Sequence, residues 1–310
     1  MSSKEFIEQL TEMAPRVPDQ AEVLALRRLS VDDVHARARR FLSMTAEASG
    51  RTGEEGDWVV GPDHTLVRLP NGGRAVAYHA SGSMTVKAGL EPMSHLFTDP
   101  RDLANLTGHV EEIAKRVELD MWIGRDERLE FERLWQIKAS ATDPRAATVD
   151  AVTLRAVGAY RHYVGDVPVW GQASAVVKVA AGGQLDQLEM HVRPTSGEIV
   201  DRVAVLPPDQ AARAVLEQLS GLVTGSELDF TDIARPVSFM FGYFSHGKRK
   251  SQRYLAPAYV AMVRTEGEES LNHLAVVPAT EKQYVSFARI GADPAPSASV
   301  REPVRVAIPA

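Results

Sequence analysis

Residues 160–192, YRHYVGDVPVWGQASAVVKVAAGGQLDQLEMHV, decide the fold class of this chain. From residue 167 to residue 179, apolar or small side chains alternate with polar or bulky ones, which is the period of an extended strand with one buried face. The AAGG that follows predicts a hairpin turn at 181–183, because glycine readily adopts a positive φ. We therefore expect residues 167–179 and 185–193 to pair as antiparallel strands. The inward face would carry Val167, Val169, Gly171, Ala173, Ala175, Val177 and Val179.

The segments before this hairpin combine helices with further strands. Residues 30–49 form an amphipathic helix that Ser30 can cap, and PNGG predicts a turn between strands 66–69 and 75–78. Residues 127–141 favour a strand with Leu129, Phe131, Trp135 and Ile137 on one face and Arg133 as the exception, with a helix as the alternative. The other expected elements in this part are a helix within 105–124 and a segment, 148–164, whose start is helical in pattern but rich in β-branched residues.

The segments after the hairpin are mostly strands. A short helix is expected over 207–221, and four strands are expected within 235–247, 253–267, 271–279 and 283–290. The first two of these strands are apolar on both faces, which is typical of strands in the middle of a sheet. Because the strands come in hairpins and do not alternate with helices, the pattern predicts an α+β fold and not a doubly wound parallel one. We expect antiparallel sheets built of hairpins or a meander, either open or barrel-like, with a few helices packed on them.

The chain has 310 residues, and we expect three segments along it. These are an N-terminal α+β half at 1–147, a second half at 148–290 that holds the hairpin and the aromatic strands, and a loose tail at 291–310 rich in Pro, Ala and Ser.

Composition excludes several classes of function. The formal net charge is −6, so the chain has no broad attraction for phosphate backbones, and we expect no nucleic-acid partner. There is no cysteine, which excludes thiol nucleophiles, disulfides and cysteine-ligated metals. No window approaches the ~20 apolar residues of a membrane span, and the N-terminus has no signal-peptide core. We therefore expect a cytoplasmic protein without a membrane partner.

The opening stretch also resembles a known module. An aromatic run, a G-x-P-V turn followed by an aromatic residue and glycine, a valine-rich strand and a glycine turn are similar to the propeptide module of thermolysin-like and fungalysin-like metalloproteases and to the related PepSY module. The matching residues are Tyr160, Tyr163, Val167, Pro168, Val169, Trp170, Gly171, Val176, Val177, Gly183 and Leu188. The resemblance implies a sheet packed on a helix in a module that binds or inhibits. The chain has no His-Glu-x-x-His motif, so it is not itself such a protease.

Motifs for cofactors and metals are absent from the sequence. The nine histidines show no metal-ligand spacing, and there is no phosphate-cradling or dinucleotide-binding glycine pattern. We expect no cofactor and no catalytic metal.

The candidate site is inferred from residue type and strand parity. A ligand cavity needs a wall of small residues facing aromatic residues with polar tips, and we expect the hairpin to supply the first and strands 237–244 and 254–262 the second. His246 would be the acid or base near neutral pH. The expected catalytic residues are His246, Tyr243, Tyr254 and Asp120, and the expected substrate-binding residues are Tyr259, Phe241, Ala173, Ala175, Trp170 and Trp122.

Asp120 enters that set because it lies between apolar residues and near Trp122. A carboxyl group beside an indole in an apolar pocket would have a raised pKa and could act as an acid. The alternative for Asp120 is a surface position at a helix end.

Two classes of function follow. The first is a cofactor-independent enzyme of small-molecule secondary metabolism, such as antibiotic biosynthesis, which cyclises or isomerises a small apolar, polyketide-like substrate in a sheet-lined cavity. Positioning in a closed site can supply ~7–11 kcal/mol of a barrier without a diagnostic motif. The second is a non-catalytic binding or inhibitory module, as the propeptide resemblance implies. An enclosed apolar cavity with polar tips pointing in would favour the enzyme, whereas a solid core with an exposed apolar patch larger than roughly 600 Å² would favour the binding module.

Overall fold

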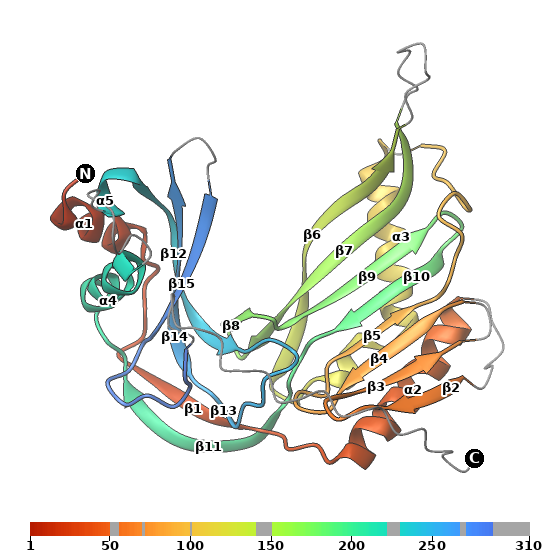
Figure 1. Ribbon diagram of the computed structural model, residues 1–310, viewed down its shortest axis with the longest axis horizontal. Helices are drawn as coiled ribbons and strands as arrows, with labels where there is room; N and C mark the ends of the chain where they lie inside the picture. The colour runs from red at the N-terminus through yellow and green to blue at the C-terminus, as the bar shows by residue number, and fades with distance from the viewer. Residues whose placement is uncertain are drawn as a thin grey trace.

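The computed structural model describes residues 1–49, 56–69, 72–99, 101–140, 151–221, 230–266 and 271–287. Its main feature is an open sheet of twelve strands with neighbour order β15-β14-β12-β8-β7-β9-β10-β5-β4-β3-β2, and β6 pairs with β7 beside this path. All neighbours are antiparallel except β8 and β12, which run parallel. The fold class is therefore α+β with mostly antiparallel sheets, and the long sheet does not close on itself (Figure 1).

The strands before the hairpin of the opening stretch are β2 (Asp57–Val60), β3 (His64–Arg68), β4 (Arg74–Tyr78), β5 (Met84–Lys87), β6 (Glu127–Ala139) and β7 (Val152–Val164). Those from the hairpin onward are β8 (Val167–Gly171), β9 (Ser174–Ala180), β10 (Gln184–Met190), β12 (Ala234–Ser245), β14 (Pro257–Thr265) and β15 (Leu271–Pro278).

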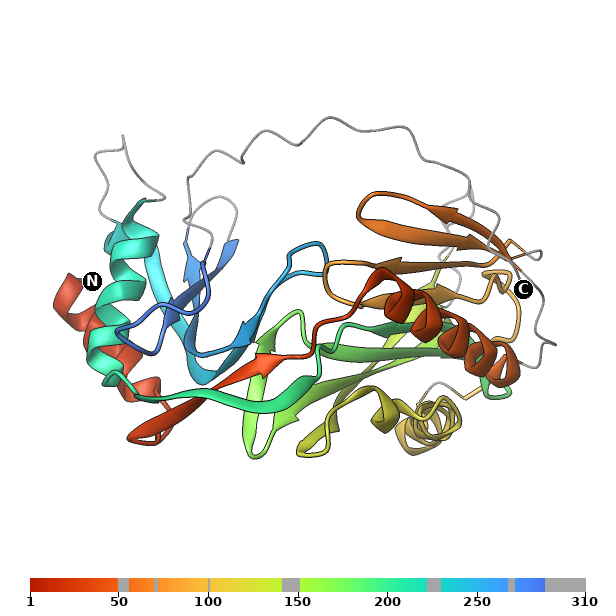
Figure 2. The same cartoon turned by 90° about the horizontal axis from the view of Figure 1, so that it is seen from below.

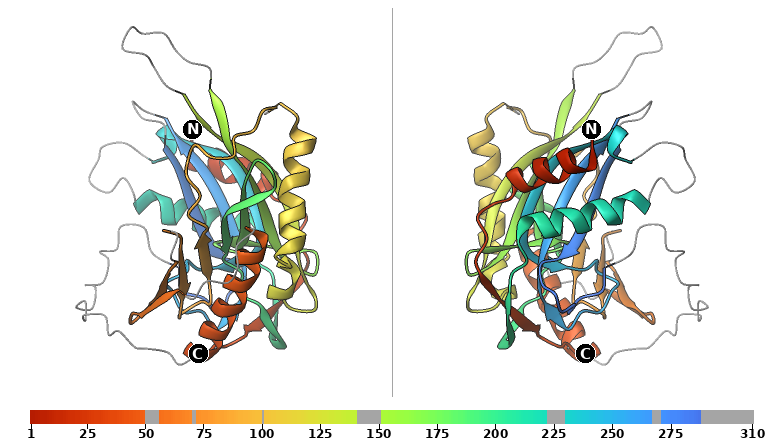
Figure 3. Two further views of the ribbon diagram at one scale, coloured as in Figure 1. Left: turned by 90° about the vertical axis from the view of Figure 1, so that its right-hand side faces the viewer. Right: turned by 90° about the vertical axis from the view of Figure 1, so that its left-hand side faces the viewer.

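Helices cover the two ends of the long sheet. At one end α1 (Ser3–Met13), α4 (Pro208–Ser220) and the short α5 (Phe230–Ile233) pack on β12, β14 and β15 around one apolar core. At the other end α2 (Val31–Ala48) and α3 (Leu103–Arg116) bury their apolar faces on β4, β5, β7, β9 and β10. Figure 3 shows α1 and α4 side by side on one end and α3 along the other.

A second, three-stranded sheet links these ends. Its order is β11-β1-β13, with β1 at Gln20–Leu26, β11 at Thr195–Ala204 and β13 at Tyr254–Leu255. In Figure 2, β1 and β11 run side by side from the α1–α4 end toward α2, which begins just after β1. The pocket described below lies at one end of this linking sheet, where β1 ends and β11 begins.

The hairpin predicted from the opening stretch is confirmed, with one correction. Strands β9 and β10 are antiparallel, with Ala180 opposite Gln184, and Ala175 is fully buried. However, residues 167–179 are not one strand, because the chain breaks between β8 and β9. Gly171 has a φ of +84°, and a Cβ there would lie 2.2 Å from the carbonyl oxygen of Ser245, so the chain bends where β8 meets β12.

Most of the other predicted elements are confirmed. Residues 30–49 form α2 with the Ser30 cap, 207–221 hold α4, strands 66–69 and 75–78 pair, and β12 and β14 lie inside the sheet. The segment 148–164, for which helix and strand were both open, forms the strand β7 from Val152 to Val164. The predicted boundary at 147/148 and the tail at 291–310 lie outside the described residues.

Two predicted strand details are wrong. In β6 the pairing with β7 slips between Phe131 and Arg133, and this bulge reverses the side-chain alternation. Leu134 consequently packs on the core, and Trp135 is 39% exposed instead of sharing a face with Leu129. The expected last strand at 283–290 is irregular over its described part, 283–287.

Candidate functional site

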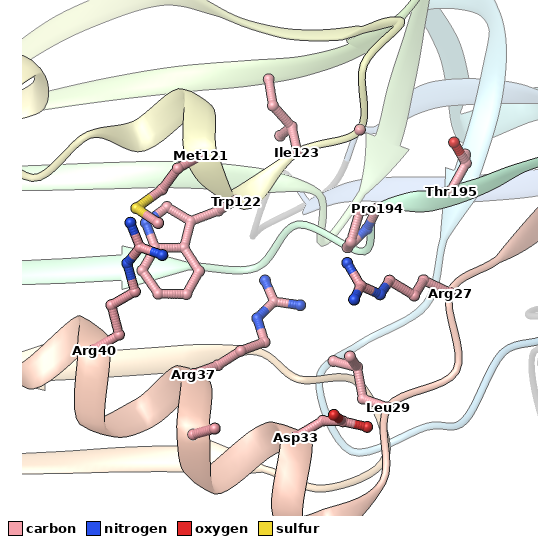
Figure 4. A pocket seen from close by; sticks show the side chains of 12 residues that line it. Arg27, Leu29, Asp33, Arg37, Arg40, Met121, Trp122, Ile123, Pro194 and Thr195 are labelled. Atoms are coloured by element: carbon pink, nitrogen blue, oxygen red, sulfur yellow. The ribbon is translucent and has the colours of Figure 1, made fainter.

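A pocket with a volume of about 330 Å³ lies where α2, the end of β1, the turn before β6 and the start of β11 meet. Arg27 follows β1, Arg37 and Arg40 project from α2, and Thr195 begins β11 (Figure 4). The 3-10 helix η1 (Leu119–Trp122) supplies the facing wall. Three segments far apart in sequence, 27–40, 121–124 and 194–195, therefore build one site.

Arginines give the pocket its charge. In Figure 4 the guanidinium groups of Arg27 and Arg37 turn into the same space. Within the described part of the chain neither guanidinium makes an ion pair or a hydrogen bond, while Arg40 is 3.7 Å from Glu118 in an exposed pair. Burial, together with the nearby charge of Arg27, lowers the pKa of Arg37 to about 10. The Asp33 carboxylate lies near both guanidinium groups but forms an ion pair with neither, so two like charges held close together favour an anionic ligand.

The one acidic side chain of the pocket lining is already engaged. Asp33 forms the capping box of α2, with its carboxylate accepting the Ser30 backbone N–H at 2.9 Å and the Ser30 hydroxyl at 2.7 Å. These two bonds lower the pKa of Asp33, so it stays ionised. It lies on the same helix face as Arg37, but no carboxylate oxygen of the described residues comes within 4.0 Å of that guanidinium, which remains available to a ligand.

An apolar wall faces the arginines. It consists of Met121, Trp122 and Ile123, while the apolar residues Leu29 and Pro194 lie beside Arg27 (Figure 4). Trp122 is 4% exposed, stacks edge-on against Phe41, and has the Arg37 guanidinium 5.3 Å from its ring centre. Its indole nitrogen is buried and has no hydrogen-bond partner in the described residues. The pocket is therefore amphipathic, cationic on one side and aromatic on the other.

The buried carboxylate of Glu127 lies directly behind two residues that line the pocket, Gly124 and Thr195. One carboxylate oxygen accepts the backbone N–H of Thr195 at 2.6 Å and its hydroxyl at 2.7 Å. The other accepts the backbone N–H of Gly124 at 2.9 Å and Nε2 of His162 at 2.9 Å. Burial alone would raise the pKa of Glu127, but these hydrogen bonds outweigh it and lower the pKa, so the group is ionised.

The three tyrosines predicted for the site lie in three different apolar clusters. Tyr243 packs with the Leu24 cluster, and burial raises its pKa to about 12. Tyr254 packs against Val23 and Ala256, with its ring 6.5 Å from that of Tyr284. Tyr259 lies in the core under α1 and α4 and donates its hydroxyl to the Leu206 carbonyl at 2.7 Å.

His246 is also separate from the pocket. It is 9% exposed, and its ring packs on those of Phe244 and Phe287. Burial, with the positive charges of Lys250 and Arg193, lowers its pKa. Its imidazole is therefore enclosed by aromatic side chains, away from the lining of the pocket.

The expected small wall and aromatic wall do not face each other. Strands β8 and β12 are hydrogen-bonded neighbours, so their faces lie side by side in one sheet. Ala173 packs with Tyr243, Ala175 lies in the core under α2 and α3, and Phe241 lies in the core under α1 and α4. Trp170 donates its indole N–H to the Phe241 carbonyl at 3.0 Å and thereby ties β8 to β12.

Of the predicted site residues, Trp122 lines the pocket, and its neighbour Asp120 does not. Asp120 is exposed, as the alternative of a surface position at a helix end requires. The sequence interpretation missed Arg27, Arg37, Arg40 and Thr195. One feature of the sequence does point to this part of the pocket. The i, i+4, i+7 spacing of Asp33, Arg37 and Arg40 places these charged residues on one face of a predicted helix.

The described residues hold no group of three His, Asp or Glu side chains that could bind a metal ion. No helix in the same residues is long and apolar enough to cross a membrane.

Comparisons with known proteins give little further information. No family model matches the chain, and a search of curated proteins finds no relative. Among solved structures, the chain is similar to an uncharacterized protein from Eubacterium rectale ATCC 33656, with a TM-score of 0.46 and 10% sequence identity over 87% of this chain and 86% of that one. The resemblance of residues 160–192 to propeptide modules stays a prediction.

Proposed function

We propose that this protein binds a small organic anion, such as a phosphate monoester or a carboxylate with an aromatic or apolar body, in the pocket between α2 and η1. The observation that carries the proposal is the pair of guanidinium groups, Arg27 and Arg37, that enter the pocket without a carboxylate or hydrogen-bond partner in the described residues. A ligand anion would supply that partner, and the wall at Trp122 would receive the apolar body.

Binding has more support than catalysis. A general acid or base must reach the reacting atom of the substrate, and the acidic side chain that lines the pocket, Asp33, already accepts two bonds from Ser30. The buried Glu127 has four donors and lies behind the wall. The cyclase or isomerase reaction remains a prediction, and the ligand we propose is anionic and not purely apolar.

Calorimetric titration tests the proposal with phenyl phosphate, benzoate and the neutral phenol as probes. The wild-type protein should bind the two anions more tightly than phenol. Arg37→Gln should weaken phenyl phosphate binding by about 10- to 150-fold, because a hydrogen bond to a charged group contributes about 1.5–3 kcal/mol.

Arg213→Gln is the matched control. It removes the same charge from α4, at the far end of the molecule, where Arg213 lies 3.8 Å from Asp209 in an exposed pair. Its affinity for phenyl phosphate should equal that of the wild type. Equal affinity for phenol and phenyl phosphate, or an Arg37→Gln variant that binds phenyl phosphate as well as the control does, would contradict the proposed function.

A further inference from the structure

Glu127 connects the two walls of the pocket that face α2. Its carboxylate holds the backbone N–H of Gly124, next to the Trp122 wall, and the backbone N–H of Thr195, at the start of β11. The chain of bonds continues, because the carbonyl of Pro194 accepts the backbone N–H of Arg27 at 2.9 Å. One side chain thus links the aromatic wall to the segment that carries Arg27.

We infer that Glu127 is the positioning residue of the anion pocket, holding the 121–124 and 194–195 segments at the separation that lets the aromatic wall and Arg27 contact one ligand. This inference rests on the proposed function. Glu127 is at the first position of β6, and its side chain is 1% exposed, as is that of His162, which donates to it. It touches no ligand itself and acts through the two segments that it holds.

The way the donors are divided makes the role testable. Each carboxylate oxygen accepts one backbone N–H and one side-chain group. In Glu127→Gln one of these oxygens becomes an NH2 group. The Thr195 hydroxyl and the His162 ring can each turn or change tautomer to accept a proton, but a backbone N–H cannot reverse its direction. Whichever way the amide is oriented, Gly124 or Thr195 must lose its acceptor.

The experiment combines hydrogen exchange with the titration of phenyl phosphate. In Glu127→Gln we expect the Gly124 or the Thr195 amide proton to exchange about tenfold faster or more, since a buried hydrogen bond is lost. The affinity for phenyl phosphate should fall about tenfold, the equivalent of one such bond. The amide of Val260 in β14, far from the site, should exchange as in the wild type.

Glu189→Gln is the matched control. Glu189, on β10, accepts from Nε2 of His191 at 2.9 Å, and this second Glu–His pair does not line the pocket. This variant should leave both amide protons and the affinity unchanged. If Glu127→Gln does not fold, Thr195→Val removes only the hydroxyl bond and should lower the affinity for phenyl phosphate by a smaller factor.

The outcomes separate the two proposals. If both amide protons exchange at the wild-type rate in Glu127→Gln, the inference is overturned whatever the ligand does. It is also overturned if exchange rises while the affinity for phenyl phosphate stays the same. If the wild type binds none of the anions, the proposed function fails, and with it the site that Glu127 would position.

Discussion

The junction of β8 and β12 makes one long sheet from the two helix-covered ends, and Gly242→Ala probes it. A Cβ on Gly242 would lie 2.3 Å from the Pro168 carbonyl oxygen and 2.6 Å from the Trp170 indole nitrogen. The first of these atoms belongs to the backbone of β8, so it cannot turn aside as the end of a flexible side chain would. The added methyl group must therefore push the two strands apart.

The magnitude follows from what that separation disrupts. Overpacking in a well-packed interior costs about 1–3 kcal/mol, and loss of the Trp170 bond to the Phe241 carbonyl costs about 1 kcal/mol more. We expect Gly242→Ala to lower the free energy of unfolding by about 2–4 kcal/mol. The matched control is Gly108→Ala in α3, where a Cβ meets nothing within 4 Å. Because alanine favours a helix over glycine, this control should gain about 0.5–1 kcal/mol.

Urea denaturation followed by circular dichroism measures both variants under the same conditions. The decisive result is the sign of the change in the free energy of unfolding. Gly242→Ala should lower it and Gly108→Ala should raise it, although both replace a glycine by an alanine. If Gly242→Ala unfolds within about 0.5 kcal/mol of the wild type, the close contact of β8 with β12 is absent and the reasoning fails.

Two further predictions concern buried polar groups. Tyr259→Phe should lower the free energy of unfolding by about 1 kcal/mol in thermal denaturation, because the hydroxyl bond to the Leu206 carbonyl is lost, and phenyl phosphate titration should show unchanged affinity. Burial lowers the pKa of both His35 and His79 from the usual 6.5. Since the unfolded chain then binds more protons, their contribution to stability is complete above pH 6.5 and is lost as the pH falls through the lowered values. In a pH series of urea denaturations, the free energy of unfolding of the double variant His35→Gln, His79→Gln should fall less steeply with decreasing pH than that of the wild type. An equally steep fall would contradict this assignment.

Periodicity and turn chemistry along the chain predicted much of the local structure. The alternation in residues 174–180, the glycine turn and the Ser30 cap are properties of neighbouring residues, and the structure contains each of them. The apolar character of both faces placed β12 and β14 inside the sheet. A capping box at Ser2 and Glu5 also marks the start of α1, and its Ser-x-x-Glu pattern is local in the same way.

Tertiary structure decided the details that depend on distant partners. The bend at Gly171 brings its backbone within 2.2 Å, measured from where a Cβ would lie, of the Ser245 carbonyl oxygen, so it needs glycine for a contact with a residue far away in sequence. Residue type alone groups the three tyrosines, yet each packs in a different core. Tyr254 lies on β13 of the three-stranded sheet, whereas Tyr243 and Tyr259 lie on β12 and β14 of the long sheet and pack in different clusters.

The pocket was beyond prediction for the same reason. The i, i+4, i+7 spacing along α2 could suggest a charged helix face, but such a face is usually solvated. Only the folded chain brings Arg27 to Arg37 and places Trp122 opposite them, with Glu127 joining the segments behind. Local pattern encodes which residues share a face of a helix or strand, whereas the convergence of three separate segments on one space depends on long-range packing that no local period records.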